Sequence, residues 1–429
     1  MPTLLVNRLD HMEIPLNSAW RKRAVIGAAV ALCVVYVLLA GRLFLGSLFD
    51  ERAEIASLQR SITLDPWNAD YRNHLGRYFS LVARDPGAAI QPFRAAVQLD
   101  PHAARYWFDL ASAYQVLGDV SHQTDALEHA IQADPTTPDV AWEAANFYLV
   151  QGDEAKALRE FRVVLQNEPT LADPAIQFCW RINPDVDVLL RDVVPPRSEA
   201  YIAFLNLLMR KQETAGTAKV WAAMMATPQT FELRYVNEYL QYLLNHKDVD
   251  QARLVWQQAA PLFGLSAYVP SGRNLIVNGD FSLDVLNGGF DWQYDKQQSV
   301  TLTLDPSDFH SGHRSLLIAF DGPGVTDAGI RQFIAVQPNT SYEFSAYYKN
   351  GEIEGAGAPH FTIQDVYTRE VLYDSDELKE AGFWKSATGE FTTGADTKLV
   401  ILHIRRLPEG SPIRGKLWVD DFRLTPKRQ

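Results

Sequence analysis

Three short segments in the last third of the chain alternate apolar side chains with polar and charged ones. Because alternate residues of a β-strand point to opposite faces of a sheet, each segment predicts a buried apolar row and an outward polar row. The outward residues are Tyr347, Lys349, His360, Thr362, Gln364, His403 and Arg405. Their hydroxyl, amide, imidazole and cationic groups can hold a hydroxyl-rich ligand, and Arg405 with Arg406 suits an anionic group. We expect the seven residues to line one concave sheet.

Motifs for catalysis are missing from the sequence. The string from Gly410 to Lys416 has the spacing of a phosphate-binding loop, but Leu417 stands where Ser or Thr is required. A strand is expected there instead of a helix, so we reject a phosphate site. The sequence also has no nucleophile elbow, HExxH motif or catalytic Cys context. We therefore expect a binding protein and not an enzyme.

The composition limits the class of protein. Of 429 residues, 47% are hydrophobic and 21% are charged, which is typical of globular domains and excludes a disordered or fibrous chain. The net charge of −12 argues against nucleic acid as a partner, since phosphates need clustered Lys and Arg. Cys33 and Cys179 are the only cysteines, so we expect neither a disulfide framework nor a Cys-based zinc site.

An apolar run near the N-terminus predicts a membrane anchor at 24–49. The segment from Ala24 to Gly41 carries no charge, and apolar character resumes after Arg42. A bilayer takes about 20 residues to cross. The basic cluster Arg21-Lys22-Arg23 predicts that residues 1–23 form a cytoplasmic tail. We therefore expect a single-pass inner-membrane protein with its bulk in the periplasm. A cleaved signal peptide is the alternative, and the long tail before the basic cluster favours a retained anchor.

Four acidic-Pro dipeptides follow this run at almost even spacing. They are Asp65-Pro66, Asp100-Pro101, Asp134-Pro135 and Glu168-Pro169, with intervals of 35, 34 and 34 residues. This period is typical of stacked helical hairpins, since each hairpin exposes an apolar face that only its neighbour can bury. The period breaks at 170–198, where Pro184 and Pro195 interrupt helices, and returns in weaker form around Trp221. We interpret 51–263 as one α-solenoid with a degenerate middle.

The repeating segments resemble the tetratricopeptide repeat, W-x2-L-G-x2-Y followed by A-x3-F and P. One unit carries Trp107, Leu110, Ala111, Tyr114, Leu127, Ala130 and Pro135, and the units before and after it match in residue type. The resemblance implies a concave groove that binds a peptide or a partner protein. Candidate groove residues on the first helices are Arg72, Asn73, Arg105, Asp109, Glu143 and Asn146. The aromatic residues Trp107, Tyr114, Tyr148, Phe161 and Trp256 are expected in the core instead.

The character of the sequence changes after a linker at 264–273. Over 274–426, short alternating runs are separated by Gly, Asn, Asp and Pro, which is typical of an antiparallel β-sandwich or jelly roll. The expected strands are 275–277, 300–304, 315–320, 330–336, 342–349, 360–366, 384–391, 398–404 and 415–424. The fold class is therefore a multidomain α and β chain: a transmembrane helix, an α-solenoid of helical hairpins and a C-terminal sandwich.

Several segments of this last domain resemble the jelly-roll carbohydrate-binding modules of the galactose-binding-like superfamily. They include Asn274-Leu-Ile-Val-Asn-Gly-Asp-Phe281, Gly288-Gly-Phe-Asp-Trp292, His310-Ser-Gly-His-Arg-Ser-Leu316 and Trp418-Val-Asp-Asp-Phe-Arg-Leu424. The resemblance implies glycan binding, and it places Trp292 and Trp384 in the core. It also implies a structural calcium, for which the matching positions are Asp280, Gly312, Asp420 and Asp421. Acidic residues at strand ends are also ordinary turn formers, so both readings stay open.

Together these features predict a membrane-anchored scaffold of the bacterial cell envelope. The solenoid is expected to bind a partner protein and the sandwich a polysaccharide, in the assembly or export of an exopolysaccharide or other surface polymer. Two alternatives stay open. The chain can be a purely structural interaction subunit whose sandwich packs on the solenoid or on a partner. It can also be a glycan-active enzyme, which requires two carboxylates converging in a cleft of the β domain.

Overall fold

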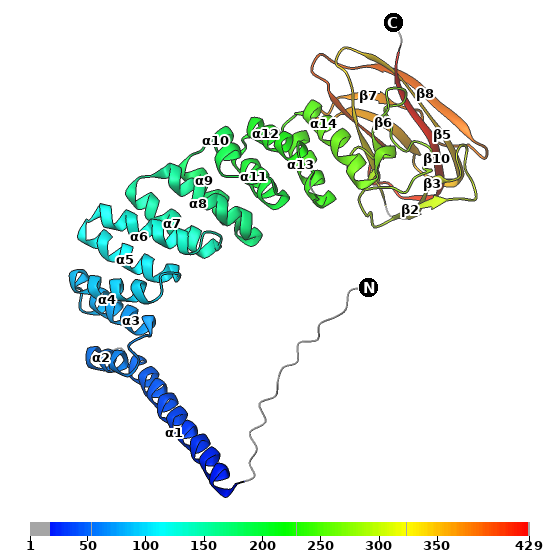
Figure 1. Ribbon diagram of the computed structural model, residues 1–429. Coiled ribbons are helices and arrows are strands. Elements are labelled where there is room, and N and C mark those ends of the chain that lie inside the picture. Colours follow the sequence, from blue (N-terminus) through cyan, green and yellow to red (C-terminus); the bar gives the residue numbers. More distant parts are fainter. Residues whose placement is uncertain (1–17, 53, 229, 323, 428–429) are drawn as a thin grey trace, which may run out of the picture. The chain divides into compact units, whose positions relative to one another are not determined.

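The computed structural model describes residues 18–427 except 53, 229 and 323. The chain divides into two compact units, Met1–Leu171 and Ala172–Gln429 (Figure 1). The division falls where the 34-residue period breaks, and the second unit contains both the later helices and all the described strands. Most of the predicted cytoplasmic tail lies outside the described residues, and the predicted domain limits stay predictions.

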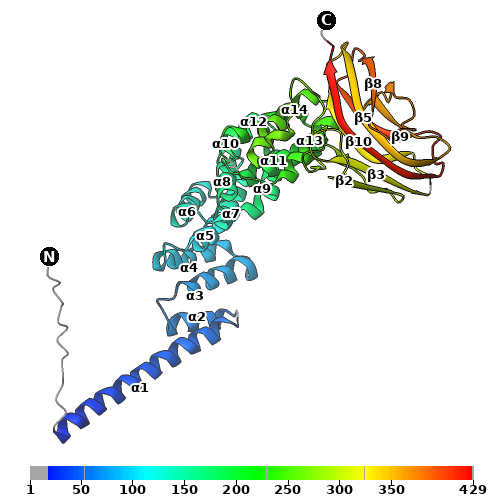
Figure 2. The same cartoon turned by 90° about the vertical axis from the view of Figure 1, so that its right-hand side faces the viewer.

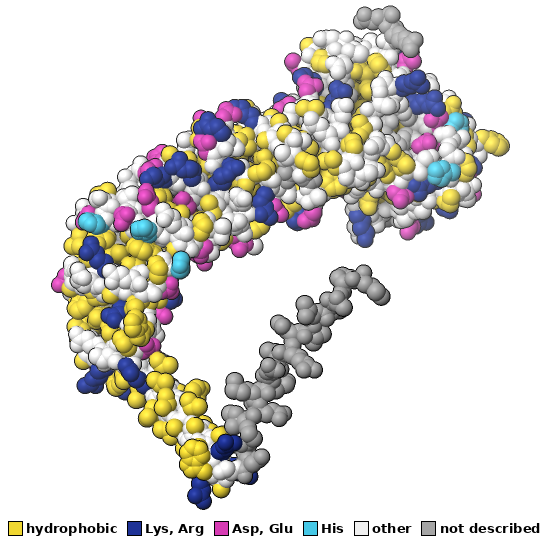
Figure 3. Space-filling model, viewed as in Figure 1, with side chains coloured by type: hydrophobic (Ala, Val, Ile, Leu, Met, Phe, Trp, Pro, Cys, Tyr) yellow, Lys and Arg dark blue, Asp and Glu magenta, His cyan; other side chains and the backbone are white. Residues whose placement is uncertain are grey.

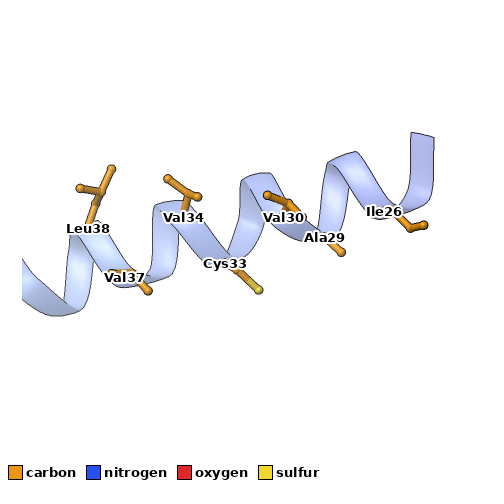
Figure 4. Close-up of a pocket in the computed structure, with 7 residues that line it drawn as sticks. All are labelled: Ile26, Ala29, Val30, Cys33, Val34, Val37 and Leu38. Carbon is orange, nitrogen blue, oxygen red and sulfur yellow. The ribbon is translucent and has the colours of Figure 1, made fainter. Parts of the chain in front are cut away.

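Helix α1 (Ala19–Asp50) is long and apolar enough to cross a membrane. Hydrophobic side chains cover its length and basic side chains lie at its start (Figure 3). A hollow on this helix is lined only by its own side chains, among them Ile26, Cys33 and Leu38, so this hollow is not a pocket between elements (Figure 4).

The C-terminal end of α1 belongs to the packed helices of the first unit. The guanidinium of Arg42 donates to the carbonyl oxygens of Leu64 and Thr63 at the end of α2 (Ile55–Leu64). Gly46 is buried against the ring of Tyr71. The apolar part before Arg42 is therefore the part available to a bilayer, and its 18 residues from Ala24 to Gly41 span about 27 Å as a helix.

Regular hairpins make up the rest of the first unit, and they lie side by side in both views (Figures 1 and 2). The first hairpin joins α3 (Ala69–Arg77), which continues as a π-helical turn (Tyr78–Val82), to α4 (Pro86–Leu99). The next two join α5 (Ala104–Leu117) to α6 (Val120–Ala133), and α7 (Pro138–Gln151) to α8 (Glu154–Asn167). A short 3-10 turn, Pro169–Leu171, follows. These hairpins confirm the fold that the acidic-Pro spacing predicts.

The acidic residue before each Pro ends one helix and begins the next turn. Asp100 follows α4, and its carboxylate accepts from the backbone N–H of His102; Asp134 follows α6 and accepts from Thr137. A second acidic series, not predicted from the sequence, starts the second helix of each hairpin. Asp85, Asp119 and Asp153 lie 34 residues apart, and their carboxylates cap α4, α6 and α8.

Small residues and aromatic rings interlock where the helices of a hairpin meet. Gly76 of α3 lies against the ring of Phe93 of α4, and a Cβ atom at position 76 would come within 2.5 Å of that ring. Of the expected core aromatics, Tyr114, Tyr148, Phe161 and Trp256 are buried. Trp107 is only half-buried, because its indole N–H reaches the Pro101 carbonyl at the surface. Tyr106 and Phe108 on either side of it are buried instead.

The second unit begins with less regular helices. They are α9 (Ala172–Ile182), α10 (Val186–Asp192), α11 (Ser198–Lys211), α12 (Thr214–Met225), α13 (Leu233–Asn245) and α14 (Val249–Ala259), then 3-10 turns at Ala260–Phe263 and Ser266–Tyr268. The Pro residues act as predicted, since α9 ends before Pro184 and α10 before Pro195. The buried indoles of Trp221 and Trp256 then form the core of the last two hairpins.

The sandwich consists of two antiparallel sheets of five strands each (Figure 2). The first sheet has the order β1-β4-β9-β6-β7, with β1 (Gln293–Tyr294), β4 (Asp327–Ala335), β9 (Leu399–Arg406), β6 (Pro359–Asp365) and β7 (Val371–Asp374). The second has the order β2-β3-β10-β5-β8, with β2 (Val300–Asp305), β3 (Ser315–Gly322), β10 (Ile413–Pro426), β5 (Ser341–Gly355) and β8 (Lys385–Thr392). The inner faces of both sheets form one apolar core.

Three sequence expectations in the sandwich need correction. Residues 275–277 form no strand, because the N–H of Ile276 donates to the Asn274 side chain and that of Val277 to the Gln332 side chain. The short strands β1 and β7 were not expected. Trp292 is buried as predicted, but Trp384 is only half-buried and lies outside the core.

The last helices and the sandwich contact each other within the second unit. The Trp256 indole lies where a side chain at Gly289 would have to be, and its N–H donates to the Tyr268 carbonyl. The Tyr367 hydroxyl donates to the carbonyl of Leu244 at 2.8 Å. The ammonium of Lys398 pairs with Asp250 at 2.7 Å. These contacts use loops and strand ends of the sandwich.

Substitution of Gly76 by Ala tests the hairpin packing. The added methyl group meets the Phe93 ring, so we expect a loss of about 1–3 kcal/mol in the free energy of unfolding. Urea unfolding in detergent, followed by helical circular dichroism, measures it. Gly87→Ala in the first turn of α4 is the control, because the nearest atom to a Cβ there is 3.4 Å away. Equal destabilisation by both variants contradicts the packing argument.

Candidate glycan-binding face

The seven residues predicted to line one sheet lie on two different sheets. Tyr347 and Lys349 belong to β5 of the second sheet. His360, Thr362 and Gln364 belong to β6, and His403 and Arg405 to β9, both in the first sheet. The expectation of one shared face is therefore wrong, because strands close in sequence are divided between the layers of a sandwich. Binding by each group separately stays a prediction.

The residues of the first sheet form a continuous polar row on its outward side. Strand register pairs Thr362 with His403, and His360 with Arg405, while Asp327 of β4 pairs with Arg405. The His403 Nδ1 atom lies 2.9 Å from the Asp327 carboxylate. The Thr362 hydroxyl donates to Asp374 of β7 at 2.7 Å. We call Asp327, His360, Thr362, Asp374, His403 and Arg405 the polar row.

His403 has the most distinctive chemistry in the polar row. The Asp327 carboxylate accepts from Nδ1–H, which leaves Nε2 of a neutral imidazole as an acceptor. This Nε2 atom is buried and has no hydrogen-bond partner among the described residues. A buried polar atom without a partner is costly, so a water molecule would satisfy it, or a ligand hydroxyl once a small movement of the neighbouring side chains exposes it. Asp327 was missed from sequence because nothing local links it to His403.

The other outward residues of the first sheet differ in how many of their hydrogen-bonding groups already have protein partners. The guanidinium of Arg405 is half-buried and pairs with Glu409 at 2.8 Å, leaving further N–H donors available. The His360 Nδ1 atom lies 2.7 Å from the Ser375 carbonyl oxygen. Gln364 instead donates to the carbonyl of Arg369 within its own turn. The strongest candidates for ligand contact are therefore His403 and Arg405.

On the second sheet, Tyr347 and Lys349 join a different cluster. The Tyr347 ring stacks on His310 with their centroids 3.5 Å apart. The Lys349 ammonium pairs with Asp308, which also accepts from the Trp384 indole N–H. This outward cluster of rings was not predicted, since His310 and Asp308 come from a loop far away in sequence.

The positions predicted for calcium come together but are already satisfied. Asp280, Gly312 and Asp421 line a polar cavity of about 660 Å³. The carboxylate of the fully buried Asp420 accepts from the N–H groups of His310, Ser311 and Asp421. Burial raises the pKa of Asp420 to about 6.

The other two carboxylates also have partners. Asp280 accepts from the Ser282 hydroxyl, and Asp421 pairs with Arg423 at 2.9 Å. Among the described residues, no three Asp, Glu, His or Cys side chains lie close enough to hold one ion. These partners favour the turn-forming role, and calcium binding here stays a prediction.

The groove candidates of the first unit fall into two groups. Asn73 of α3 and Asp109 of α5 are joined by a hydrogen bond of 2.8 Å, and Arg77 pairs with the same carboxylate oxygen. Loss of hydration and the charge of nearby Asp109 raise the pKa of Glu143 on α7. We call Asn73, Arg77, Asp109 and Glu143 the groove stripe, in which Arg77 was missed from sequence.

The remaining groove candidates lie apart from this stripe. Arg105 pairs with Asp70 at 2.7 Å and also donates to the Tyr106 hydroxyl. Arg72 donates to the Pro66 carbonyl in the preceding turn. Asn146 is exposed on α7. Whether any of the six contacts a partner protein stays a prediction.

Thermal melting in calcium or in a chelator tests the turn-forming role. Because the carboxylates already accept hydrogen bonds or pair with Arg, we expect the melting temperature to change by less than about 1 °C between 1 mM calcium and excess EGTA. A calcium-dependent rise of several degrees, abolished in Asp421→Asn but kept in Asp284→Asn, would contradict this and support the family-type site.

Comparison with known proteins agrees with the sandwich. Residues 273–408 match the family model described as a carbohydrate binding domain. No curated protein is similar enough in sequence to count as a relative.

Solved structures resemble separate parts of the chain. A family 4 carbohydrate-binding module is 18% identical and covers 35% of this chain and 99% of its own, with a TM-score of 0.28. The protein MamA is 20% identical and covers 42% and 94%, with a TM-score of 0.30. PilF of Pseudomonas aeruginosa is 16% identical and covers 53% and 92%, with a TM-score of 0.25. Likenesses this weak say nothing of ligand or partner, so the matched family is the finding that bears on the site: the C-terminal sandwich is similar to a carbohydrate-binding domain.

Proposed function

We propose that this chain is a membrane-anchored envelope scaffold that binds glycan through the polar row and a partner protein through the groove stripe. The setting we propose is the assembly or export of an exopolysaccharide or other surface polymer. One observation carries the glycan part. The buried Nε2 of His403, which has no hydrogen-bond partner among the described residues, lies beside Arg405 within residues that match a carbohydrate-binding domain.

The chemistry of the polar row favours an acidic polysaccharide. Arg405 and the neighbouring Arg331 bring two guanidinium groups to the outward face, and register places Arg331 beside His403. The Arg331 guanidinium pairs with Asp295, an exposed carboxylate that a ligand carboxylate would have to displace or share. Guanidinium groups bind carboxylates in a bidentate manner, as a uronic acid would require.

Packing at the end of α1 supports a retained anchor. A cleaved signal peptide would remove the helix that Arg42 and Gly46 attach to α2 and α3. His74 of α3 also contacts Asp50 at the last residue of α1, at 2.8 Å. The helix therefore has a structural role beyond targeting, and the basic residues at its start favour a cytoplasmic N-terminus.

The purely structural alternative gains some support from the contact of α14 with the sandwich. That contact involves the loop at Gly289 and the strand-end residues Tyr367 and Lys398. The polar row lies on a sheet face instead, so a structural contact and glycan binding are compatible in one chain.

The enzyme alternative is weaker. Asp327 and Asp374, the carboxylates hydrogen-bonded within the polar row, lie on β4 and β7, which are separated by β9 and β6. Three strand spacings amount to roughly 14 Å. Paired carboxylates in glycoside hydrolases lie about 5–9.5 Å apart. This pair is therefore too far apart for that chemistry.

Substitution of Arg405 by Ala tests glycan binding by the polar row. We expect the affinity for an acidic polysaccharide such as alginate to fall about 10-fold, since hydrogen bonds to charged groups contribute roughly 1.5–3 kcal/mol. Affinity electrophoresis of the full-length protein in detergent measures it. The control is Arg414→Ala, an exposed Arg on the other sheet. Unchanged retardation of Arg405→Ala by every polysaccharide that retards the wild type would remove the polar row from the proposal.

Charge reversal at Glu143 tests the groove stripe. Glu143→Lys inverts an exposed charge beside Asp109, so we expect capture of the partner from native membranes to fall several-fold. Quantitative mass spectrometry of the captured proteins measures the change. Glu154→Lys, an exposed Glu at the start of α8, is the control. If both variants capture the same proteins in the same amounts, the groove stripe is not the docking surface.

A further inference from the structure

Aromatic side chains gather on the outward side of the second sheet, on the opposite layer from the polar row. Trp418 of β10 lies opposite Lys349 of β5 in the strand register, and Tyr347 points the same way two residues earlier. Trp384 immediately precedes β8, the next strand in the sheet. None of these three rings is buried, so none is needed in the core. We call Tyr347, Trp384 and Trp418, with the intervening Lys349–Asp308 pair and the adjoining residue Phe383, the aromatic face.

Hydrogen bonds hold both indoles by their edges. The Trp418 N–H donates to Asp305 at 2.8 Å, and the Trp384 N–H donates to Asp308 at 3.2 Å. The Lys349 ammonium pairs with Asp308 and lies 5.8 Å from the centroid of the Trp418 ring. The rings are therefore oriented before any ligand arrives, which lowers the entropy cost of binding.

Phe383 immediately precedes Trp384 in the chain and extends into solvent. Its side chain is 87% exposed, the largest value among the large hydrophobic side chains that the structure describes. Phe309, in the loop that carries Asp308 and His310, is 41% exposed. Both rings leave apolar area in water with no gain to the fold, so they are available for contact with a ligand.

The charges on this face favour a sugar as the occupant over another protein. Protein interfaces are depleted of charged residues at their centre. Here the centre is the Lys349–Asp308 pair, with ionised Asp305 beside Trp418 and His310 against Tyr347. Hydrogen bonds from Ser307 and Trp418 lower the pKa of Asp305, so it stays an acceptor at neutral pH. A pyranose offers a C–H face to a ring and hydroxyls to such charged groups.

We propose that the aromatic face is a second glycan-binding surface, which takes neutral sugar rings on Phe383, Trp384 and Trp418 and holds their hydroxyls with Lys349 and Asp308. This inference rests on the proposed function, in that the sandwich is taken to bind glycan. The two surfaces differ in chemistry, since the polar row offers guanidinium and imidazole groups and the aromatic face offers rings. They lie on opposite layers of one sandwich, so one polymer chain or two can be held at once, with a gain in avidity.

Phe383→Ala and Trp384→Ala in the full-length protein test the proposal. The probes are soluble xylan, mixed-linkage β-glucan and alginate in affinity electrophoresis, with dissociation constants taken from the retardation. We expect each variant to bind at least one neutral polysaccharide about 10-fold more weakly than the wild type. Because Phe383 is exposed, its variant should keep the wild-type melting temperature. Trp67→Ala is the matched control, as Trp67 is 82% exposed in the first unit.

Arg405→Ala separates the two surfaces. Loss in Phe383→Ala and Trp384→Ala with unchanged binding by Arg405→Ala supports the aromatic face and removes the polar row. Loss only in Arg405→Ala overturns the aromatic face and leaves the proposed function standing. Retardation of the wild type by none of the three probes overturns the aromatic face as a site for these polymers. A loss in Trp67→Ala equal to that in Phe383→Ala also overturns it, since any exposed ring would then suffice.

Discussion

The indole of Trp256 occupies the space that a side chain at position 289 would need, and much of the second unit depends on this contact. Gly289 has a left-handed backbone with φ of +60°, which Gly adopts without strain, so the loop can approach the ring. That loop leads directly to Trp292, which stacks on Phe281 and meets Phe422 in the sandwich core. The contact of the Trp256 ring with the loop at Gly289 therefore joins the last hairpin to the sandwich, together with the Tyr367 and Lys398 contacts, and both parts belong to one compact unit.

The two-layer sandwich gives the chain two outward faces with different chemistry. Alternation along each strand puts apolar residues such as Phe361 and Leu402 between the sheets. The polar residues that alternate with them then lie on the outward faces. One face then carries imidazole, guanidinium and carboxylate groups in register, and the other carries half-buried rings with their N–H groups bonded to carboxylates. A module that contacts a polymer benefits from both, because hydrogen bonds select the sugar and rings supply apolar contact.

Local chemistry made the helical part predictable. An acidic residue before Pro both ends a helix and turns the chain, so its spacing reports the repeat directly, as at Asp100 and Asp134. A repeat buries each face on the next unit and needs few long-range contacts. The sandwich strands were found for a similar reason, since alternation is visible along the chain. The strand predicted at 275–277 does not form, because the side chains of Asn274 and Gln332 accept the backbone hydrogen bonds of Ile276 and Val277.

The candidate sites show which features could not be predicted from the sequence. The outward residues themselves, such as Lys349 and His403, follow from the period of two in a strand, and the positions of the candidate groove residues on first helices follow from the repeat. Strand order does not follow, because β5 and β6 are consecutive in sequence yet enter different sheets. Sequence by itself determined the anchor-like helix, the helical hairpins and the alternation of the strands, since these arise from contacts between near neighbours. Only the tertiary structure decided that His403 meets Asp327 and that Tyr347 meets His310, because those pairings depend on which distant strands and loops lie side by side.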